Sequence, residues 1–409
     1  MTASIDQLLD SGMKRTQTEV TFLPDPEPRE VIVPIISVDD HLIEPPWTFE
    51  GRLPAKLASK APKIIELEGG AQAWDFDGKQ VANVGFNAVA GRPSSEYTKE
   101  PTRFDEMRRG AWDIKDRIKD MDINGIYASL NFPSSLVGFG GQKLVHVNDV
   151  ELGLATLRAW NSWHIEEWAG QPGNRIIGCQ IPWLLDPAIG AAEIRKNAEL
   201  GFKSVTFPES TAKLGLPSVH TGHWDPFFQA CEETGTVICL HIGSSSDVVG
   251  TSADAPLAVV NALLYVGALI ATVDWLYSRV PARFPDLRIV MSEGGIGWVP
   301  SLIDRLDHNI KHHAYEDTWK GISETPAEVL RRNFRFATID DPAGFEQRHR
   351  IGVENILVEA DYPHADSTWP DTQAVLAEQM DGVPRKEVEL MAFRNAVELF
   401  RHPMPPGVS

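Results

Sequence analysis

Four side chains that could bind a metal ion stand at or near the ends of apolar, strand-like segments. Asp39 and His41 end IISVDDH, His241 ends TVICLH, and Asp361 follows ILVEA. Two carboxylates and two imidazoles suit a hard-to-borderline divalent cation. Because side chains alternate along a strand, Asp39 and His41 share one face while Asp40 points to the other. The alternative for each segment is a polar strand end or a satisfied core histidine, but four matching strand ends favour a metal site.

Further polar residues follow two of these strands. Glu293 ends RIVMSE. Three roles are open for its side chain: metal ligand, general base, or hydrogen-bonded partner of the ligands. Asp361 opens DYPHADSTWP, in which His364 and Asp366 could support the ligands or exchange protons. We therefore expect Asp361, Glu293 and His364 to be the catalytic residues.

The elements that must position these residues follow a regular pattern. Asp39 and Asp361 lie about 320 residues apart, so only a closed fold brings them together, and a (β/α)8 barrel directs all its strands to one face. Short apolar runs alternate with amphipathic helical stretches, as in βα units around a parallel sheet. The sequence thus predicts an α/β fold, a TIM barrel over residues 31–400, with eight strands at 31–38, 125–132, 175–181, 204–207, 236–241, 287–293, 334–338 and 355–360.

Two of the intervening helices carry clear boundary signals. Asp186-Pro187 is a good N-cap and first-turn pair for a helix that ends at Gly201. The same design recurs from Asp225 to Gly235.

The first crossover is longer than a single helix requires. Within residues 45–110, Gly69-Gly70 and Asp77-Gly78 are turn signals between alternating apolar residues, as in successive hairpins. We predict that this region is a small inserted antiparallel cap beside the site, after the first strand. Arg92 in its tail is a candidate for binding a substrate carboxylate, although most arginines in such a stretch are solvated or structural.

Other segments have less specific signals. Residues 1–30 are polar, contain PDPEP, and are interpreted as an N-terminal arm that packs on a partner subunit; residues 401–409 form a tail. GFGGQK at 138–143 lacks the context of a phosphate or dinucleotide site and is predicted to be a loop after the second strand. Trp298 and Trp369 are candidates for lining a substrate pocket, with a core or interface role as the alternative.

Composition narrows the class of protein. The chain has 409 residues, 43% of them hydrophobic, and a formal net charge of -19 without a basic stripe, which disfavours nucleic acid and anionic membranes as partners. The three cysteines form no CxxC and are expected to be buried thiols in a reducing compartment. Since neither a signal peptide nor an apolar run of about 18 residues stands out, we expect a cytoplasmic protein.

The motifs together resemble a known family. VDDHLIEPP, GCQIPWLLDPAIGAAEIRKNAELGFKSVTFPES, HIG, PDLRIVMSEGGIGWVP and DYPHADSTWP are similar to the amidohydrolase-related group that includes aminocarboxymuconate-semialdehyde, γ-resorcylate and 5-carboxyvanillate decarboxylases. The resemblance implies a (β/α)8 barrel with one divalent ion on Asp39, His41, His241 and Asp361, and it favours a homodimer or larger assembly. Many members begin with His-x-His, where this chain has Asp-x-His. Several decarboxylases carry a histidine where this chain has Glu293.

These observations leave three functions open. The first is non-oxidative decarboxylation of an aromatic or enoic acid, with Asp361 or Glu293 as the proton donor. The second is hydrolysis of an amide, ester or lactone by a metal-activated water, with Asp361 as base and Glu293 or His364 serving the leaving group. The third is a barrel that binds a small molecule without turnover. The expected ion is Zn²⁺, with Mn²⁺ or Fe²⁺ as alternatives.

Overall fold

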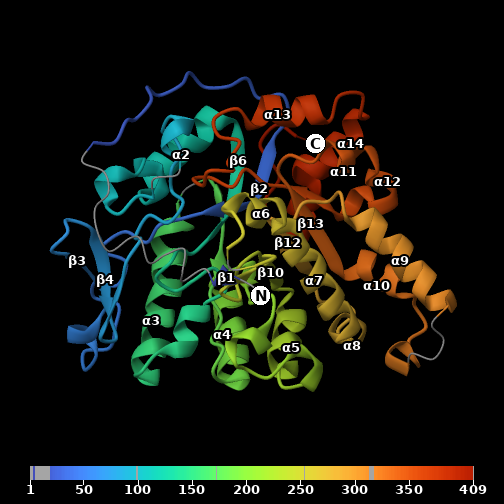
Figure 1. Cartoon of the computed structure of the whole chain (residues 1–409), viewed down its shortest axis with the longest axis horizontal. Coiled ribbons are helices and arrows are strands. Elements are labelled where there is room, and N and C mark those ends of the chain that lie inside the picture. Colours follow the sequence, from blue (N-terminus) through green and yellow to red (C-terminus); the bar gives the residue numbers. More distant parts are fainter. Residues whose placement is uncertain are drawn as a thin grey trace.

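Parallel strands occupy the centre of the molecule and helices pack around them, as the computed structural model shows (Figure 1). The structure describes residues 3–4, 19–97, 100–171, 173–252, 254–312 and 317–408. The fold is α/β, as predicted. A three-stranded parallel sheet contains β2 (Ile35–His41), β6 (Ile126–Phe132) and β7 (Ile176–Ile177). A six-stranded parallel sheet contains β8 (Cys179–Gln180), β9 (Ser204–Thr206), β10 (Val237–His241), β12 (Ile289–Ser292), β13 (Phe334–Thr338) and β14 (Ile356–Val358).

Strands that follow one another along the chain also lie side by side in space. The chain passes from the first sheet to the second at Gly178, between β7 and β8. The first strand and the segment after the last one are joined as well: the Asp361 amide donates to the Asp39 carbonyl at 2.9 Å, and the His41 amide donates to the Tyr362 carbonyl at 2.7 Å. These bonds place the two ends of the chain's strand series next to each other.

Every predicted strand is present; only the strand 334–338 has the predicted bounds, and the first and third strands show the most informative differences. The first begins at Ile35, after Pro34, and continues to His41, so Asp39 and His41 belong to the strand itself. Proline has no amide hydrogen to donate to a ladder, which explains the later start. The third is interrupted at Gly178, where an added Cβ would lie 3.2 Å from the Ile165 side chain. This close packing explains why glycine, which has no side chain, occupies position 178.

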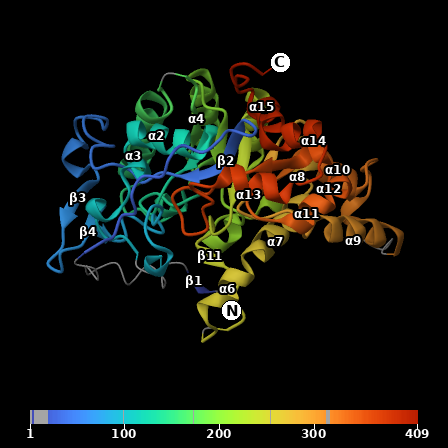
Figure 2. The same ribbon diagram turned by 90° about the horizontal axis from the view of Figure 1, so that it is seen from above.

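The helices cover the outside of the sheets (Figures 1 and 2). The Asp186 side chain accepts hydrogen bonds from the first turn of α4, which confirms the predicted cap. The predicted cap at Asp225 is wrong, because its side chain lies within the first turn of α5 and accepts no capping bond. The larger helices are α2 (Ile114–Asn124), α3 (Val150–Trp163), α4 (Pro187–Glu199), α5 (Asp225–Thr234), α7 (Leu264–Tyr277), α9 (Val299–His312), α10 (Pro326–Asn333) and α13 (Thr372–Gln379). The shorter ones are α6 (Leu257–Ala262), α8 (Val280–Arg283), α11 (Pro342–Glu346), α12 (Arg348–Ile351), α14 (Arg385–Glu389) and α15 (Asn395–Phe400).

The long first crossover contains the predicted hairpins. Its antiparallel sheet has the strands β3 (Lys63–Glu66), β4 (Gln72–Phe76) and β5 (Lys79–Val81) and lies at the edge of the molecule (Figure 1). The Asp77 carboxylate accepts hydrogen bonds from the backbone just before α3. Residues 83–92, after this sheet, reach the strand-end face, where the Val89 and Ala90 amides both donate to the Pro363 carbonyl at 3.0 Å.

The chain ends and the remaining features complete the fold. Strand β1 (Ala3–Ser4) pairs with β11 (Asp247–Val248), whereas residues 1–2 and 5–18 of the predicted arm and residue 409 of the tail lie outside the described residues. Arg29 binds the Asp371 carboxylate of its own chain at 2.8 Å.

The cysteines are buried free thiols, as expected. Within the described ranges, no helix combines the length and apolar character that crossing a membrane requires.

Candidate metal centre

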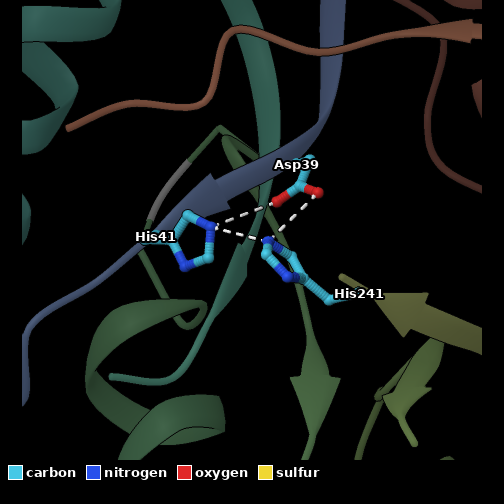
Figure 3. Close-up of side chains that lie close together, drawn as sticks. All are labelled: Asp39, His41 and His241. Carbon is cyan, nitrogen blue, oxygen red and sulfur yellow. Dashed lines mark hydrogen bonds and ion pairs between the residues drawn. The ribbon is translucent and has the colours of Figure 1, made fainter. Parts of the chain in front are cut away.

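Three of the predicted ligands converge from the ends of β2 and β10. Figure 3 shows Asp39, His41 and His241 turned toward one another. The Nε2 atoms of the two imidazoles lie 3.0 Å apart. The Asp39 carboxylate approaches His41 Nε2 at 3.4 Å and His241 Nε2 at 3.6 Å. All three side chains are buried, so the group forms one compact cluster in the interior.

The fourth predicted ligand joins this cluster from the opposite end of the sequence. The Oδ1 atom of Asp361 lies 3.4 Å from His41 Nε2 and 2.9 Å from His364 Nδ1. The His364 ring stacks on the His41 ring with centroids 3.8 Å apart. His364 therefore stands beside the ligands, and its nitrogen shares the carboxylate of Asp361 with His41.

The chemistry of this donor set fits a divalent cation. Neither carboxylate oxygen of Asp39 receives a hydrogen bond from any described residue, although both are buried; Nδ1 of His41 is in the same position. A buried charge without a partner is costly, and a bound cation would offset this cost. Metal–ligand bonds of about 2.0–2.2 Å in a tetrahedral site place ligand atoms roughly 3.3–3.6 Å apart. The separations of Asp39 from His41, Asp39 from His241 and His41 from Asp361 are close to this range, and the two imidazole nitrogens are slightly closer, at 3.0 Å. Asp361 shares His41 with the group of Asp39 and His241 and forms a second group with His41 and His364.

The electrostatics of the metal-free cluster point the same way. Burial, followed by repulsion from Glu359 and Asp361, raises the pKa of Asp39 well above its usual range. Burial also raises the pKa of Asp361. The same desolvation lowers the pKa of His241 to about 3, which leaves its imidazole neutral. Neutral imidazoles beside crowded carboxylates form an environment that a divalent ion would stabilise.

The backbone at two strand ends has an unusual conformation. Asp361 has φ 51° and Glu293 has φ 57°, and both are non-glycine residues in the left-handed region. The Glu293 amide is held there by a hydrogen bond of 3.1 Å to the Glu359 carboxylate. Such conformations cost energy and concentrate at functional sites. At Asp361 and Glu293 this backbone conformation directs the acidic side chain to the face formed by the strand ends.

Glu293 lies directly next to the cluster. Its Oε2 atom is 3.3 Å from His241 Nε2. Residues His241 and Ser292 are register partners in β10 and β12, which explains why the next residue reaches the histidine. A second carboxylate, Glu209, follows β9, and burial raises its pKa to about 8. Glu209 was not predicted, although its position after the strand 204–207 carries the same signal as Glu293.

The neighbouring side of β2 is tied to a buried charge network. Asp40 points away from the ligands, as predicted, and accepts hydrogen bonds from Ser37 Oγ and the Tyr362 amide. The Arg117 guanidinium donates to the His41 carbonyl and lies over the Tyr362 ring, 4.4 Å from its centroid. This network joins the β2 and β14 ends that supply the ligands. The sequence offered no local sign of it, because Arg117 sits in an ordinary amphipathic helix.

Three other predicted residues lie in structural surroundings. Arg92 is buried and donates to the Glu106 carbonyl. Trp298 donates from Nε1 to the Gly294 carbonyl at 2.7 Å and packs on Phe336. Trp369 donates to the Asp120 carbonyl at 3.1 Å. Substrate binding by Arg92, Trp298 or Trp369 stays a prediction.

Comparison with known proteins identifies the class. Residues 51–402 match the family model described as amidohydrolase, so the chain belongs to this family and is an enzyme of the amidohydrolase superfamily. No match was found among curated proteins.

Solved structures share the fold. An amidohydrolase from Mycobacterium avium subsp. paratuberculosis K-10 is 21% identical, with 91% of this chain and 100% of that chain covered and a TM-score of 0.68. 5-Carboxyvanillate decarboxylase from Sphingomonas paucimobilis is 20% identical, covering 90% and 99%, with a TM-score of 0.61. The 5-carboxyvanillate decarboxylase from Novosphingobium aromaticivorans, complexed with manganese and 4-hydroxy-3-methoxy-5-nitrobenzoic acid, is 16% identical, covering 93% and 100%, with a TM-score of 0.63.

Proposed function

We propose that this enzyme is a metal-dependent decarboxylase that removes CO2 from a planar aromatic or enoic carboxylic acid. The observation that carries the proposal is the position of Asp361, whose Oδ1 lies between His41 Nε2 and His364 Nδ1 at a buried centre. One carboxyl group can there border a bound ion and exchange a proton with a histidine. The decarboxylases among the similar structures support this choice.

The proposal includes a closed (β/α)8 barrel with the insertion of residues 45–110 beside its mouth. The two parallel sheets would be arcs of one barrel, interrupted at Gly178. The hydrogen bonds from Asp361 to Asp39 and from His41 to Tyr362 support closure between the first and last strands. All ligands would then stand at the carboxyl ends of strands, where barrel active sites lie.

Asp39, His41, His241 and Asp361 would hold one divalent ion. When bound, the ion supplies a Lewis acid that fixes and polarises the oxygens of the substrate. The carboxylates suit Mn²⁺ as well as Zn²⁺, and the similar structure complexed with manganese favours Mn²⁺. Zn²⁺ stays the alternative.

Proton transfer would belong to Asp361 and His364. Asp361 donates a proton to the substrate carbon that bears the carboxylate. The bond between that carbon and the carboxylate then breaks, its electron pair returns to the conjugated system, and CO2 leaves. His364 Nδ1, 2.9 Å away, would then pass its proton to the Asp361 carboxylate while His364 Nε2 takes up a proton from solvent, so the imidazole is neutral before and after the step.

Hydrolysis is the second candidate, and Glu293 is the observation that favours it. Its carboxylate lies 3.3 Å from His241 Nε2, where it could protonate a leaving group. Burial raises the pKa of Glu293 well above its usual range, which favours the protonated form that a general acid needs. An amide, ester or lactone would be the substrate.

One experiment separates the two reactions. The Mn²⁺-loaded enzyme is incubated in D2O with hydroxybenzoates and, separately, with lactones and amides. Decarboxylation predicts CO2 release together with deuterium at the vacated carbon, and loss of both in Asp361→Asn. Asp75→Asn, which changes a partly exposed carboxylate in β4, serves as the control. Acid released from lactones or amides without any CO2 would replace the first proposal with the second.

Three further points stay predictions. They are a cytoplasmic location, assembly as a homodimer or larger oligomer, and segment boundaries at residues 30, 110 and 400. Small molecules, rather than nucleic acids or membranes, are the proposed partners.

A further inference from the structure

The glycine-rich segment 138–141 places an aromatic ring on the candidate metal ligands. Phe139 lies between glycines, and its ring centroid is 4.6 Å from that of His241 and 4.8 Å from that of His41. The His364 ring is 6.1 Å away. One ring thus contacts imidazoles from three separate strand ends, and it covers the cluster from the side of the loops.

The same ring also borders a cavity near the strand-end face. This cavity has a volume of about 30 Å3 and is lined by Phe86, Ser134, Gln142, Lys143 and Gly243 besides Phe139. Gly243 is the second residue after His241, so the cavity adjoins the ligand-bearing strand end. A space of this size holds roughly two water molecules. A benzoate-sized molecule therefore cannot reach the ligands through it unless a side chain moves.

Hydrogen bonds and close contacts fix the backbone around Phe139. The ring itself has only Gly138 and Gly140 as its neighbours in the sequence. The Phe139 carbonyl accepts a hydrogen bond from Thr206 Oγ1, and the Gly140 amide donates to Gln142 Oε1 at 2.8 Å. An added Cβ at Gly140 would lie 3.1 Å from the Pro208 nitrogen and from Ser244. Rotation of the side chain is thus an easier route to an opening than displacement of the loop.

The base of the loop is anchored as well. Glu44 accepts a hydrogen bond from the Ser134 amide at 3.0 Å and another from Trp160 Nε1 at 2.9 Å. All three residues of this anchor are buried, so the loop starts from a fixed point beside β6. The anchor and the hydrogen bond from Thr206 fix the backbone of Phe139 relative to His41 and His241.

We propose that Phe139 is the gate and the specificity-determining wall of the active site. Its ring covers the ligand cluster, rotates away from His41 and His241 to admit a substrate, and then packs against the substrate's planar face. The wall accepts planar acids with one ring and rejects acids with two fused rings. The substrate part of this inference rests on the proposed decarboxylase function, whereas the covering of the metal ligands does not.

The gate is tested by the rate at which a chelator removes the ion. Stopped-flow mixing of the Mn²⁺-loaded enzyme with a chelator should show metal release at least about tenfold faster in Phe139→Ala than in the wild type, with Phe139→Leu between them. Metal content before mixing should be equal in all three. Phe22→Ala, at an exposed position, should match the wild type. Equal release rates in Phe139→Ala, Phe139→Leu and wild type would overturn the gate.

The wall is tested by the binding of two aromatic acids of different size. Dissociation constants for 2-hydroxybenzoate and 1-hydroxy-2-naphthoate are measured by calorimetry on the same proteins. Phe139→Ala should improve the affinity for the fused-ring acid relative to the single-ring acid by about tenfold; an unchanged ratio would contradict the wall. If no acid releases CO2 but chelation is faster in the variants, the decarboxylase proposal fails and the gate stands. If CO2 is released and neither readout changes, only the gate and wall fail.

Discussion

The Nδ1 atom of His241 forms a hydrogen bond of 2.6 Å with the backbone carbonyl of Ile242. A carbonyl can only accept, so Nδ1 carries the hydrogen and Nε2 keeps its lone pair. That lone pair points at His41, Asp39 and Glu293. A second hydrogen bond that fixes the tautomer in this way is typical of histidines that bind metals.

His241→Gln should therefore remove metal binding. We expect the affinity for Mn²⁺ or Zn²⁺ to fall by more than about 100-fold, because loss of a ligand exceeds the 10–100-fold effect of losing a supporting group. Metal analysis after equilibrium dialysis measures this change. His220→Gln alters an exposed histidine and should bind metal like the wild type. Full occupancy in His241→Gln would remove this residue from the ligand set.

Metal binding should release protons. Burial and neighbouring carboxylates raise the pKa of Asp39, and burial raises that of Asp361, so the metal-free centre holds protons more strongly than ordinary carboxylates do. An ion displaces them, and its affinity should increase with pH. Calorimetry in buffers of different ionisation enthalpy should detect about one proton or more per ion. His241, with a pKa of about 3, contributes none. Heats that do not depend on the buffer would contradict the prediction.

Tyr362→Phe should weaken the support of the centre. The Tyr362 hydroxyl donates to the buried Asp120 carboxylate at 2.5 Å, and its ring lies beneath Arg117. In Tyr362→Phe the buried Asp120 carboxylate loses one hydrogen-bond donor. This loss lowers the free energy of unfolding by about 1–3 kcal/mol. Urea denaturation measures this loss. Tyr265→Phe, at an exposed position, should leave the stability unchanged, and equal stabilities of Tyr362→Phe and wild type would refute the assigned role.

The metal-free enzyme should lose stability in acid partly through His164. Burial lowers the pKa of this residue to about 3, whereas an exposed histidine titrates near 6.5. Below pH 6.5 the unfolded chain takes up a proton that the native chain refuses, so the stability is fully present above pH 6.5 and falls as the pH drops toward 3. Between pH 7.5 and 5 the loss is about 2 kcal/mol.

His164→Gln should reduce this pH dependence by the same amount. Glutamine keeps an acceptor for the Cys179 amide, which now donates to His164 Nε2 at 3.4 Å, but it does not titrate. The measurement is the difference in unfolding free energy between the two pH values, in the presence of a chelator. His223→Gln is a surface control. An unchanged difference in His164→Gln would show that this histidine does not titrate as described.

The sequence pointed to the four candidate ligands because each of them carries a local signal. A charged or imidazole side chain at the end of an apolar strand is unusual in itself, and Asp39, His41, His241 and Asp361 all have that position. The same rule would have found Glu209. Glu359, directly after β14, fits the rule as well, but the predicted strand 355–360 placed this residue inside the strand rather than at its end.

Contacts between distant elements carried no local signal. Phe139 belongs to a glycine-rich loop that was correctly predicted as a loop, yet only folding brings its ring onto His41 and His241. The antiparallel hairpins were predicted from their turns, but their position at the edge of the molecule depends on the contact of Asp77 with the start of α3.

By itself, the sequence determined the order of strands and helices, the residue types of a candidate cation site and the strand ends that carry them, because these depend on short-range periodicity and side-chain chemistry. Only the tertiary structure decided the distances among the ligands, the position of His364 against Asp361, and the ring of Phe139 that covers them. Those features depend on how β2, β10, β14 and the loop after β6 pack together, and packing joins residues between which the chain itself imposes no fixed spacing.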